Sequence, residues 1–191
     1  MHHDVLIERV RSCTLCEPRL PLGAHPVLQL HPAARVLLVS QAPGRKAQES
    51  GIPFDDASGE RLREWLGIVP ERFYDRRSIA ILPMGFCYPG RGKSGDLPPR
   101  PECAPAWREP LLAHLERVEL TLVVGQYAQR YHFDGPPMSL AERVRDWRRY
   151  WTEMVPMPHP SPLNNRWLRG NPWFERDLLP ALRGRVAEVL R

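Results

Sequence analysis

The sequence predicts an α/β fold of three layers, in which helices cover both faces of a four-stranded parallel sheet. Four short apolar runs are typical of buried strands, and segments with helical spacing alternate with them. Each strand is followed by a loop that contains glycine or proline. Ligands of such sheets bind beyond the carboxyl ends of the strands, so these loops are the first place to look for chemistry. The four runs are residues 34–40, 79–82, 120–124 and 154–157.

The helices are expected around these strands, in an order that follows the chain. A first helix over 4–11 leads into a pair of cysteines, and a second begins at Ser58-Gly59 with Leu62, Trp65 and Leu66 on one face. Residues 88–105 are rich in proline and glycine and are predicted to be a loop. The remaining helices are expected over 105–118, from Gln126 for a short stretch, over 139–151 and over 172–190.

Length and composition indicate one globular domain over residues 1–191, large enough to form its own core. No apolar run approaches the roughly 20 residues of a membrane span, and the first residues lack the layout of a secretory signal. We therefore expect a cytoplasmic monomer that does not bind membranes. A reducing cytosol makes disulfides an improbable use of cysteine and favours metal binding.

The chain is basic, with a formal net charge of +5, and lysine occurs only at Lys46 and Lys93. Arginine therefore carries the excess, and its guanidinium group forms forked contacts with phosphate. This charge favours a polyanionic partner such as DNA or RNA. An arginine-rich proteome from a GC-rich genome explains the same composition equally well.

The four cysteines of the chain are Cys13, Cys16, Cys87 and Cys103. One close C-x-x-C pair plus two remote residues is a pattern by which a folded domain closes a four-thiolate site. An iron–sulfur cluster and a structural zinc ion both suit four thiolates. Four unrelated buried thiols are the remaining alternative.

Gly92-Lys93-Ser94 has the appearance of the end of a phosphate-binding P-loop. The full pattern requires glycine at position 87, where the chain has Cys87, and a helix directly after the serine. The residues after Ser94 are Gly, Asp, Leu and two prolines, so we do not expect an NTPase.

Three stretches resemble the uracil-DNA glycosylase superfamily. They read Val-Leu-Leu-Val-Ser-Gln-Ala-Pro-Gly over 36–44, Gly-Ile-Pro-Phe-Asp-Asp-Ala-Ser-Gly over 51–59, and His-Pro-Ser-Pro-Leu-Asn over 159–164. The cysteine order is similar to that of the iron–sulfur-bearing bacterial branch, in which the four cysteines hold a [4Fe–4S] cluster. The resemblance implies a four-stranded sheet between helices and hydrolysis of an N-glycosidic bond in DNA.

The resemblance also implies roles for the residues of the first two stretches. Gln41 is assigned to the catalytic pocket wall, while Ala42, Pro43 and Gly44 bring the backbone to the base. Phe54 matches the aromatic residue that stacks on the flipped base, although a core aromatic would suit the same position. Asp56 matches the catalytic carboxylate, with Asp55 as the alternative. An N-cap of the following helix is the structural explanation of an aspartate here.

The third stretch supplies a histidine and the predicted contacts to DNA. His159 matches the histidine that contacts the base oxygen as negative charge develops there. Leu163 matches the wedge residue that enters the base stack, and simple packing is the alternative. Ser161, Asn164 and Arg166 are expected beside the phosphates.

The sequence departs from the family pattern at several positions. Ala42 stands where the best-known branch has a water-orienting aspartate, and residues 45–48 lack the carboxylate of the uracil-specific iron–sulfur branch. Pro83 stands where an asparagine usually reads the base edge. We therefore expect a monofunctional glycosylase for uracil or another deaminated base. The alternative is a catalytically weak or inactive protein that binds damaged or abasic DNA.

Overall fold

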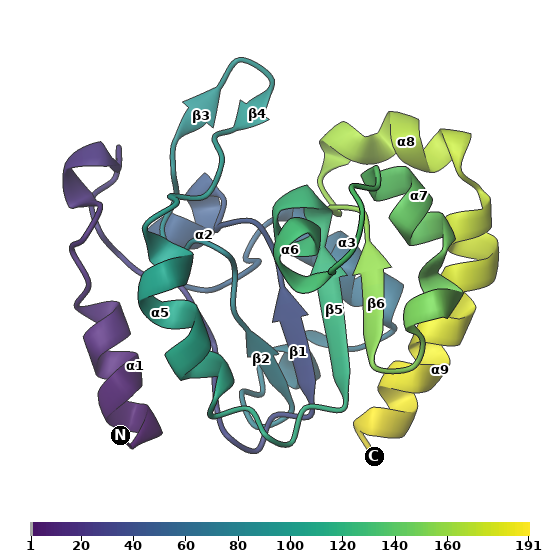
Figure 1. Ribbon diagram of the computed structural model, residues 1–191, viewed down its shortest axis with the longest axis horizontal. Helices are drawn as coiled ribbons and strands as arrows, with labels where there is room; N and C mark the ends of the chain where they lie inside the picture. The colour runs from purple at the N-terminus through teal and green to yellow at the C-terminus, as the bar shows by residue number, and fades with distance from the viewer. Residues whose placement is uncertain (1) are drawn as a thin grey trace.

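The computed structural model describes residues 2–191, and its centre is a four-stranded parallel sheet (Figure 1). The strand order is β2-β1-β5-β6, and every neighbouring pair is parallel. All four predicted strands are confirmed, each within two residues of its expected ends. Their bounds are Val36–Val39 for β1, Ile79–Ile81 for β2, Leu120–Val124 for β5 and Met154–Met157 for β6.

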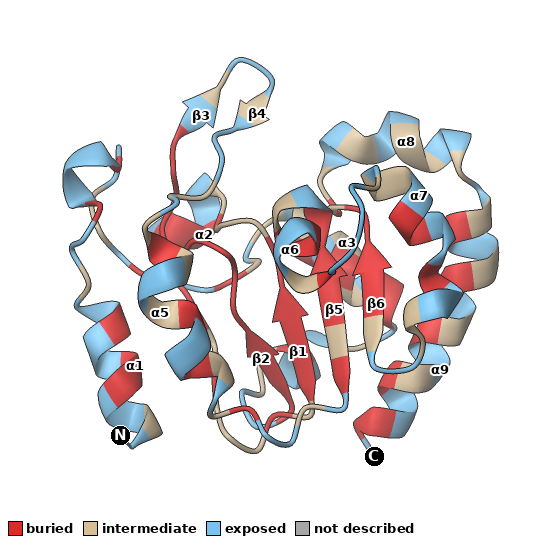
Figure 2. Ribbon diagram, in the orientation of Figure 1, coloured by how far each residue is buried: buried red, intermediate tan, exposed pale blue. Residues whose placement is uncertain are grey.

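Side chains of the strands divide between two cores, as the alternation of a strand requires. Val36 and Leu38 join one core, and Leu37 and Val39 join the other. Figure 2 shows the strands as the most continuously buried part of the chain. The three-layer α/β architecture is thus confirmed. The first core includes α3 (Ala57–Leu66) and α9 (Leu179–Val189), and the second includes α1 (His3–Arg11), α5 (Cys103–Leu112) and α6 (Gly125–His132).

Several shorter elements connect these layers. Three of them are single 3₁₀ turns, at Glu17–Arg19, Trp147–Tyr150 and Pro162–Asn164. One is a π-helical turn at Phe174–Leu178. The others are α2 (Arg45–Ser50), α4 (Pro70–Phe73), β3 (Arg91–Gly92), β4 (Gly95–Asp96), α7 (Leu140–Arg145) and α8 (Asn165–Gly170).

The prediction of a loop over 88–105 is wrong for the middle and for the end of this segment. Its middle forms a short antiparallel hairpin, in which Arg91 pairs with Asp96 and Gly92 with Gly95. This hairpin projects above the carboxyl ends of the sheet strands (Figure 1). The last residues belong to α5, which begins at Cys103 because a proline at 105 is tolerated in a first helical turn.

The predicted helix over 105–118 also extends too far. Helix α5 ends at Leu112, two residues after Pro110. After Leu112, the N–H groups of His114 and Leu115 donate to carbonyl oxygens three residues earlier rather than four, so the helix gives way to tighter turns.

Two further helices are interrupted where one continuous helix was predicted. The segment 139–151 begins with a capping box at Ser139 and Glu142, forms α7, and then tightens into a 3₁₀ turn. This tighter turn aligns Val144 and Trp147 on the core face. The segment 172–190 begins with the π turn before α9, because Pro180 has no N–H for the preceding turn.

Within the described part of the chain, every helix is too short or too polar to span a membrane.

Candidate active site

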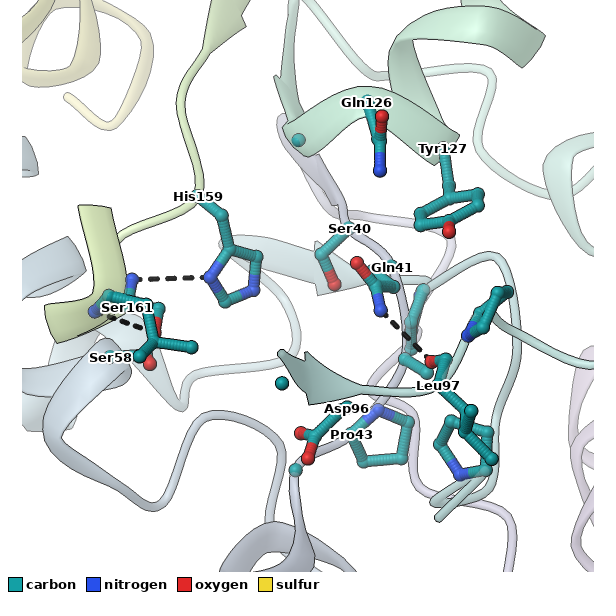
Figure 3. Close-up of a pocket in the computed structure, with 18 of the residues that line it drawn as sticks. Ser40, Gln41, Pro43, Ser58, Asp96, Leu97, Gln126, Tyr127, His159 and Ser161 are labelled. Atoms are coloured by element: carbon teal, nitrogen blue, oxygen red, sulfur yellow. Dashed lines mark hydrogen bonds between the residues drawn. The ribbon is translucent and has the colours of Figure 1, made fainter. Parts of the chain in front are cut away.

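Loops at the carboxyl ends of the strands enclose a cavity of about 660 Å³ (Figure 3). This volume lies in the range typical of small-molecule sites. The predicted catalytic and base-binding residues all line the cavity, although they come from loops far apart in the sequence. These residues are Gln41, Ala42, Pro43, Gly44, Phe54, Asp56 and His159.

The ring of His159 is fixed in orientation and in protonation. Its Nδ1 accepts a hydrogen bond from the backbone N–H of Ser161 at 3.2 Å, so the proton of the neutral ring is on Nε2. Figure 3 shows the other ring nitrogen facing the open centre of the cavity. Burial lowers the pKa of His159, against an opposite effect of Asp56 nearby. A neutral ring with an N–H donor therefore faces the cavity near pH 7.

Asp56 is the N-cap of α3 and also lines the cavity. Its Oδ1 accepts the N–H of Gly59 at 2.9 Å, which makes it the N-cap of α3. Its other oxygen, Oδ2, lies 3.2 Å from the position that a Cβ on Gly44 would occupy. The cap holds the carboxylate toward Gly44 and the cavity. Asp55 is exposed and does not line the cavity.

Phe54 has a strained backbone at the edge of the cavity. Its φ of 59° is in the left-handed region, which is uncommon for an aromatic residue and frequent at functional sites. Its carbonyl oxygen accepts from the hydroxyl of Tyr74 at 3.3 Å. A Cβ on Gly59 would lie only 1.8 Å from the same oxygen, so the turn requires glycine there. The Asp-x-Ser-Gly pattern thus has a direct structural cause.

Gln41 connects the first loop to the hairpin. Its Nε2 donates to the carbonyl oxygen of Leu97 at 3.1 Å, directly after β4 (Figure 3). The amide nitrogen is therefore engaged with the protein in this structure. Gln41 also lines the cavity.

The loop after β6 is held by internal hydrogen bonds. The Nδ2 of Asn164 donates to the carbonyl oxygen of His159 at 2.7 Å, and the Oγ of Ser161 accepts from the N–H of Leu163 at 3.3 Å. Arg61 on α3 donates to the carbonyl oxygens of residues 160 and 161, which connects the two motif-bearing loops. No sequence pattern predicted this role for Arg61.

The predicted DNA contacts differ in their location. Leu163 lines the cavity and leaves 73% of its surface exposed, while Ser161 and Asn164 line the same rim. Arg166 is exposed on α8 and does not line the cavity. The exposure of Leu163 shows that it is not a core packing residue.

Sequence reasoning missed a second acidic residue of this cavity. Asp96 lines it from β4, and Figure 3 shows its carboxylate beside Pro43. Loss of water contact raises the pKa of Asp96, while Arg91 and the hydroxyl of Tyr88 act in the opposite direction. Asp96 lies far in sequence from the three stretches that resemble the family, so no local pattern predicted its place in the cavity.

Arg108 is a buried charge that supports the floor of the cavity. It lies on α5 and is 1% exposed. Its Nη1 donates to the carbonyl oxygens of Leu82 at 3.2 Å and Pro83 at 3.3 Å, and Pro83 lines the cavity. Its Nη2 lies 2.5 Å from Nε2 of His132. Burial lowers the pKa of Arg108 to about 10, and burial with this cation lowers the pKa of His132 to about 4.

The four cysteines come together away from the cavity. All of them line one small, mostly apolar pocket, together with Leu20, Ala24, Pro26 and Phe86. Among residues 2–191, the only group of three or more candidate metal-ligand atoms within 4.8 Å of one another is His2, His3 and Asp4. No three of the cysteine sulfurs therefore lie within 4.8 Å of one another, whereas tetrahedral zinc with bonds of about 2.3 Å requires all four at roughly 3.8 Å.

Hydrogen-bond donors point at the cysteine sulfurs. The indole N–H of Trp107 donates to Sγ of Cys13 at 3.2 Å, and the N–H of Phe86 donates to Sγ of Cys103 at 3.4 Å. Burial raises the pKa of Cys87 to about 11 and that of Cys103 to about 12. These thiols are protonated without a cation, and a bound metal centre has to displace the protons.

Comparison with known proteins gives two findings. The family model described as the uracil DNA glycosylase superfamily matches residues 29–183. A type-4 uracil-DNA glycosylase from Thermotoga maritima is 27% identical over 163 residues, which cover 83% of this chain and 81% of the relative.

Proposed function

The chain belongs to the uracil DNA glycosylase superfamily, and we propose that it is a monofunctional DNA glycosylase for uracil or another deaminated base. The observation that carries this proposal is the convergence of Asp56, His159 and Phe54 on one cavity from two separate loops. A carboxylate, a neutral N–H donor and an aromatic ring are the groups that release of a flipped base requires.

The proposed reaction proceeds by departure of the base before full attack by water. As the bond between C1′ and the base nitrogen breaks, positive charge builds on the sugar and negative charge on the base. The carboxylate of Asp56 stabilises the first charge, and the Nε2–H of His159 donates to the base oxygen that carries the second. Both interactions are stronger in the transition state than in the ground state, so they accelerate the reaction.

Base recognition in this proposal depends on stacking and shape. Phe54 supplies the stacking surface, and Pro83 lines the cavity without a side-chain donor or acceptor. Discrimination between deaminated bases is therefore expected to be broad. Leu163 enters the space that the flipped nucleotide leaves, and the basic surface binds phosphates.

The activity test is incubation with duplexes that contain uracil, hypoxanthine or xanthine, followed by alkali. We expect release of at least one base. Asp56→Asn and His159→Ala should each slow release by about 100-fold or more while retaining the fold. Release from none of the three duplexes, with the metal centre intact, would contradict the proposal.

The monofunctional assignment has its own test. None of the three stretches that resemble the family contains a lysine, but Lys93 lines the cavity from the exposed turn of the hairpin. A monofunctional enzyme leaves an intact abasic strand that breaks only in alkali. Strand breakage without alkali, with borohydride trapping that Lys93→Arg abolishes, would show instead that the enzyme is also a lyase.

We further propose that the four cysteines hold a [4Fe–4S] cluster. The spacing of the sulfurs supports a group wider than one ion, and N–H donors directed at sulfur suit a cluster of thiolates and sulfides. Its role is structural, because hydrolysis transfers no electron. Anaerobic purification followed by iron, sulfide and zinc analysis tests this, and stoichiometric zinc without iron would refute it.

A binder of damaged DNA without catalysis is the second candidate function. The observation that favours it is Ala42, which places a methyl group in the cavity where another branch carries a carboxylate. A gel-shift comparison of abasic, uracil and undamaged duplexes distinguishes the two functions. Preference for abasic DNA without any base release would support the binder.

A further inference from the structure

We propose that Asp96 is a second catalytic carboxylate of this site and acts as the base that takes a proton from the attacking water. The inference rests on the glycosylase function proposed above. Asp96 lies outside all three stretches that resemble the family, on the hairpin between Cys87 and Cys103.

The position of Asp96 brings its carboxylate to the first loop. A Cβ built on Gly44 would lie 3.2 Å from Oδ2 of Asp56 and 4.0 Å from Oδ2 of Asp96. Both carboxylates therefore lie beside the bare Cα of Gly44. A side chain at position 44 would contact both of them.

The surroundings of the two carboxylates suit different roles. The N–H of Gly59 at the start of α3 stabilises negative charge on Asp56. Burial raises the pKa of Asp96, and the charge of Asp56 adds to this effect, while Arg91 and Tyr88 oppose it. Pairs of acids whose environments differ in this way commonly divide the work of stabilising charge and moving protons.

The proposed step balances in atoms and electrons. The electron pair of the bond between C1′ and the base nitrogen leaves with the base. The oxygen of water forms the new bond to C1′, and one water proton passes to the carboxylate of Asp96. Asp56 faces the sugar cation during this step, and His159 donates to the base oxygen. Asp96 then returns its proton to solvent, from which the released base is protonated.

This role accounts for two departures from the family pattern. Ala42 cannot orient water, and residues 45–48 contain no carboxylate. Asp96 supplies an acid to the same cavity from about fifty residues further along the chain. Asp96 can thus supply the carboxylate that acts on water, although the first loop contains none.

The first test compares Asp96→Asn with Asp134→Asn, an exposed aspartate outside the cavity. In single-turnover release of the base that the wild type removes best, D96N should be about 100-fold slower or more, and D134N unchanged. The wild-type rate should fall at acid pH as Asp96 takes up a proton. This acid limb should be smaller in D96N, whereas the contribution of His159 remains in both profiles. Wild-type rates in D96N would overturn the proposal.

The second test needs no turnover. A duplex with a cationic pyrrolidine in place of the sugar mimics the charge of the transition state, and a neutral tetrahydrofuran duplex is its control. Wild type and D134N should prefer the cationic duplex by about tenfold or more, and D96N should lose part of this preference, because Asp56 still faces the sugar. If the wild type releases no base, the proposed function fails, and this preference still decides whether Asp96 faces the sugar. Retention of the full preference in D96N would refute its placement.

Discussion

Protonation of His132 should lower the stability of the folded protein in mild acid. Its Nε2 accepts from the guanidinium of Arg108, so protonation would place two donors against each other in a buried site. Burial and the charge of Arg108 hold the pKa of His132 at about 4, below its ordinary value of 6.5. Between these two values the unfolded chain binds a proton that the folded chain does not. Stability from this group is therefore complete above pH 6.5 and is lost as pH falls toward 4.

The size of the effect follows from the two pKa values. A difference of about 2.5 units corresponds to about 3 kcal/mol when the loss is complete, at 1.36 kcal/mol per unit. At pH 5 the loss is about 2 kcal/mol, and at pH 7.5 it is close to zero. In a chain of this size, 2 kcal/mol lowers the melting temperature by roughly 4–8 °C.

The assay is denaturant unfolding of the wild type and His132→Gln at pH 7.5 and pH 5. The variant should be less stable at pH 7.5 but should lose about 2 kcal/mol less than the wild type on moving to pH 5. Comparison of the two chains cancels acid effects that they share, including those of His159. His2→Gln, at an exposed position, should follow the wild type. Parallel losses in wild type and H132Q would refute the reasoning.

Three further changes test separate parts of the structure. Gly59→Ala should cost about 3 kcal/mol in denaturant unfolding because its Cβ meets the carbonyl of Phe54, whereas Gly184→Ala, with open space around it, should gain about 0.5–1 kcal/mol. Leu163→Ala should slow base release from duplex on the order of tenfold and leave single-stranded substrate unaffected, and equal slowing of both would refute the wedge. Trp107→Phe removes the N–H directed at Cys13 and should lower the reduction potential of the cluster in voltammetry; an unchanged potential would contradict this role.

The strands could be predicted because parallel strands buried on both faces are continuous apolar runs. Strand β5 shows this directly, since Leu120–Val124 was expected and found with the same bounds. For a related reason, the sequence could also predict that Asp56 and His159 meet at one edge of the sheet. Each follows a strand of the same parallel sheet or the helix after it, and the carboxyl ends of those strands meet.

The remaining features depend on contacts that a local pattern does not contain. Strands β3 and β4 have two residues each, too few to show alternation of polar and apolar residues. Asp96 reaches Gly44 only because the hairpin folds over the first loop. Arg108 lies on the same helix face as Leu111, but an arginine is usually exposed, and its burial depends on a tertiary contact with the carbonyl oxygen of Leu82 after β2.

The loop that carries Asp96 begins and ends at two of the proposed cluster ligands, Cys87 and Cys103. The chain leaves Cys87, forms β3 and β4, and returns at Cys103, while Gln41 and Gly90 bond to Leu97 within the loop. Fixing both ends of a loop reduces its conformational entropy, so the cluster would hold a catalytic carboxylate in place without transferring an electron.

Removal of the cluster by oxidation and chelation should therefore free this loop before the sheet unfolds. Under brief trypsin digestion, the first cuts of cluster-free protein should fall at Arg91 or Lys93, while circular dichroism retains most of its helical signal. Protein with its cluster intact should resist cutting at these positions. First cuts elsewhere, for example at Arg166 on exposed α8, would show that the cluster does not restrain the hairpin.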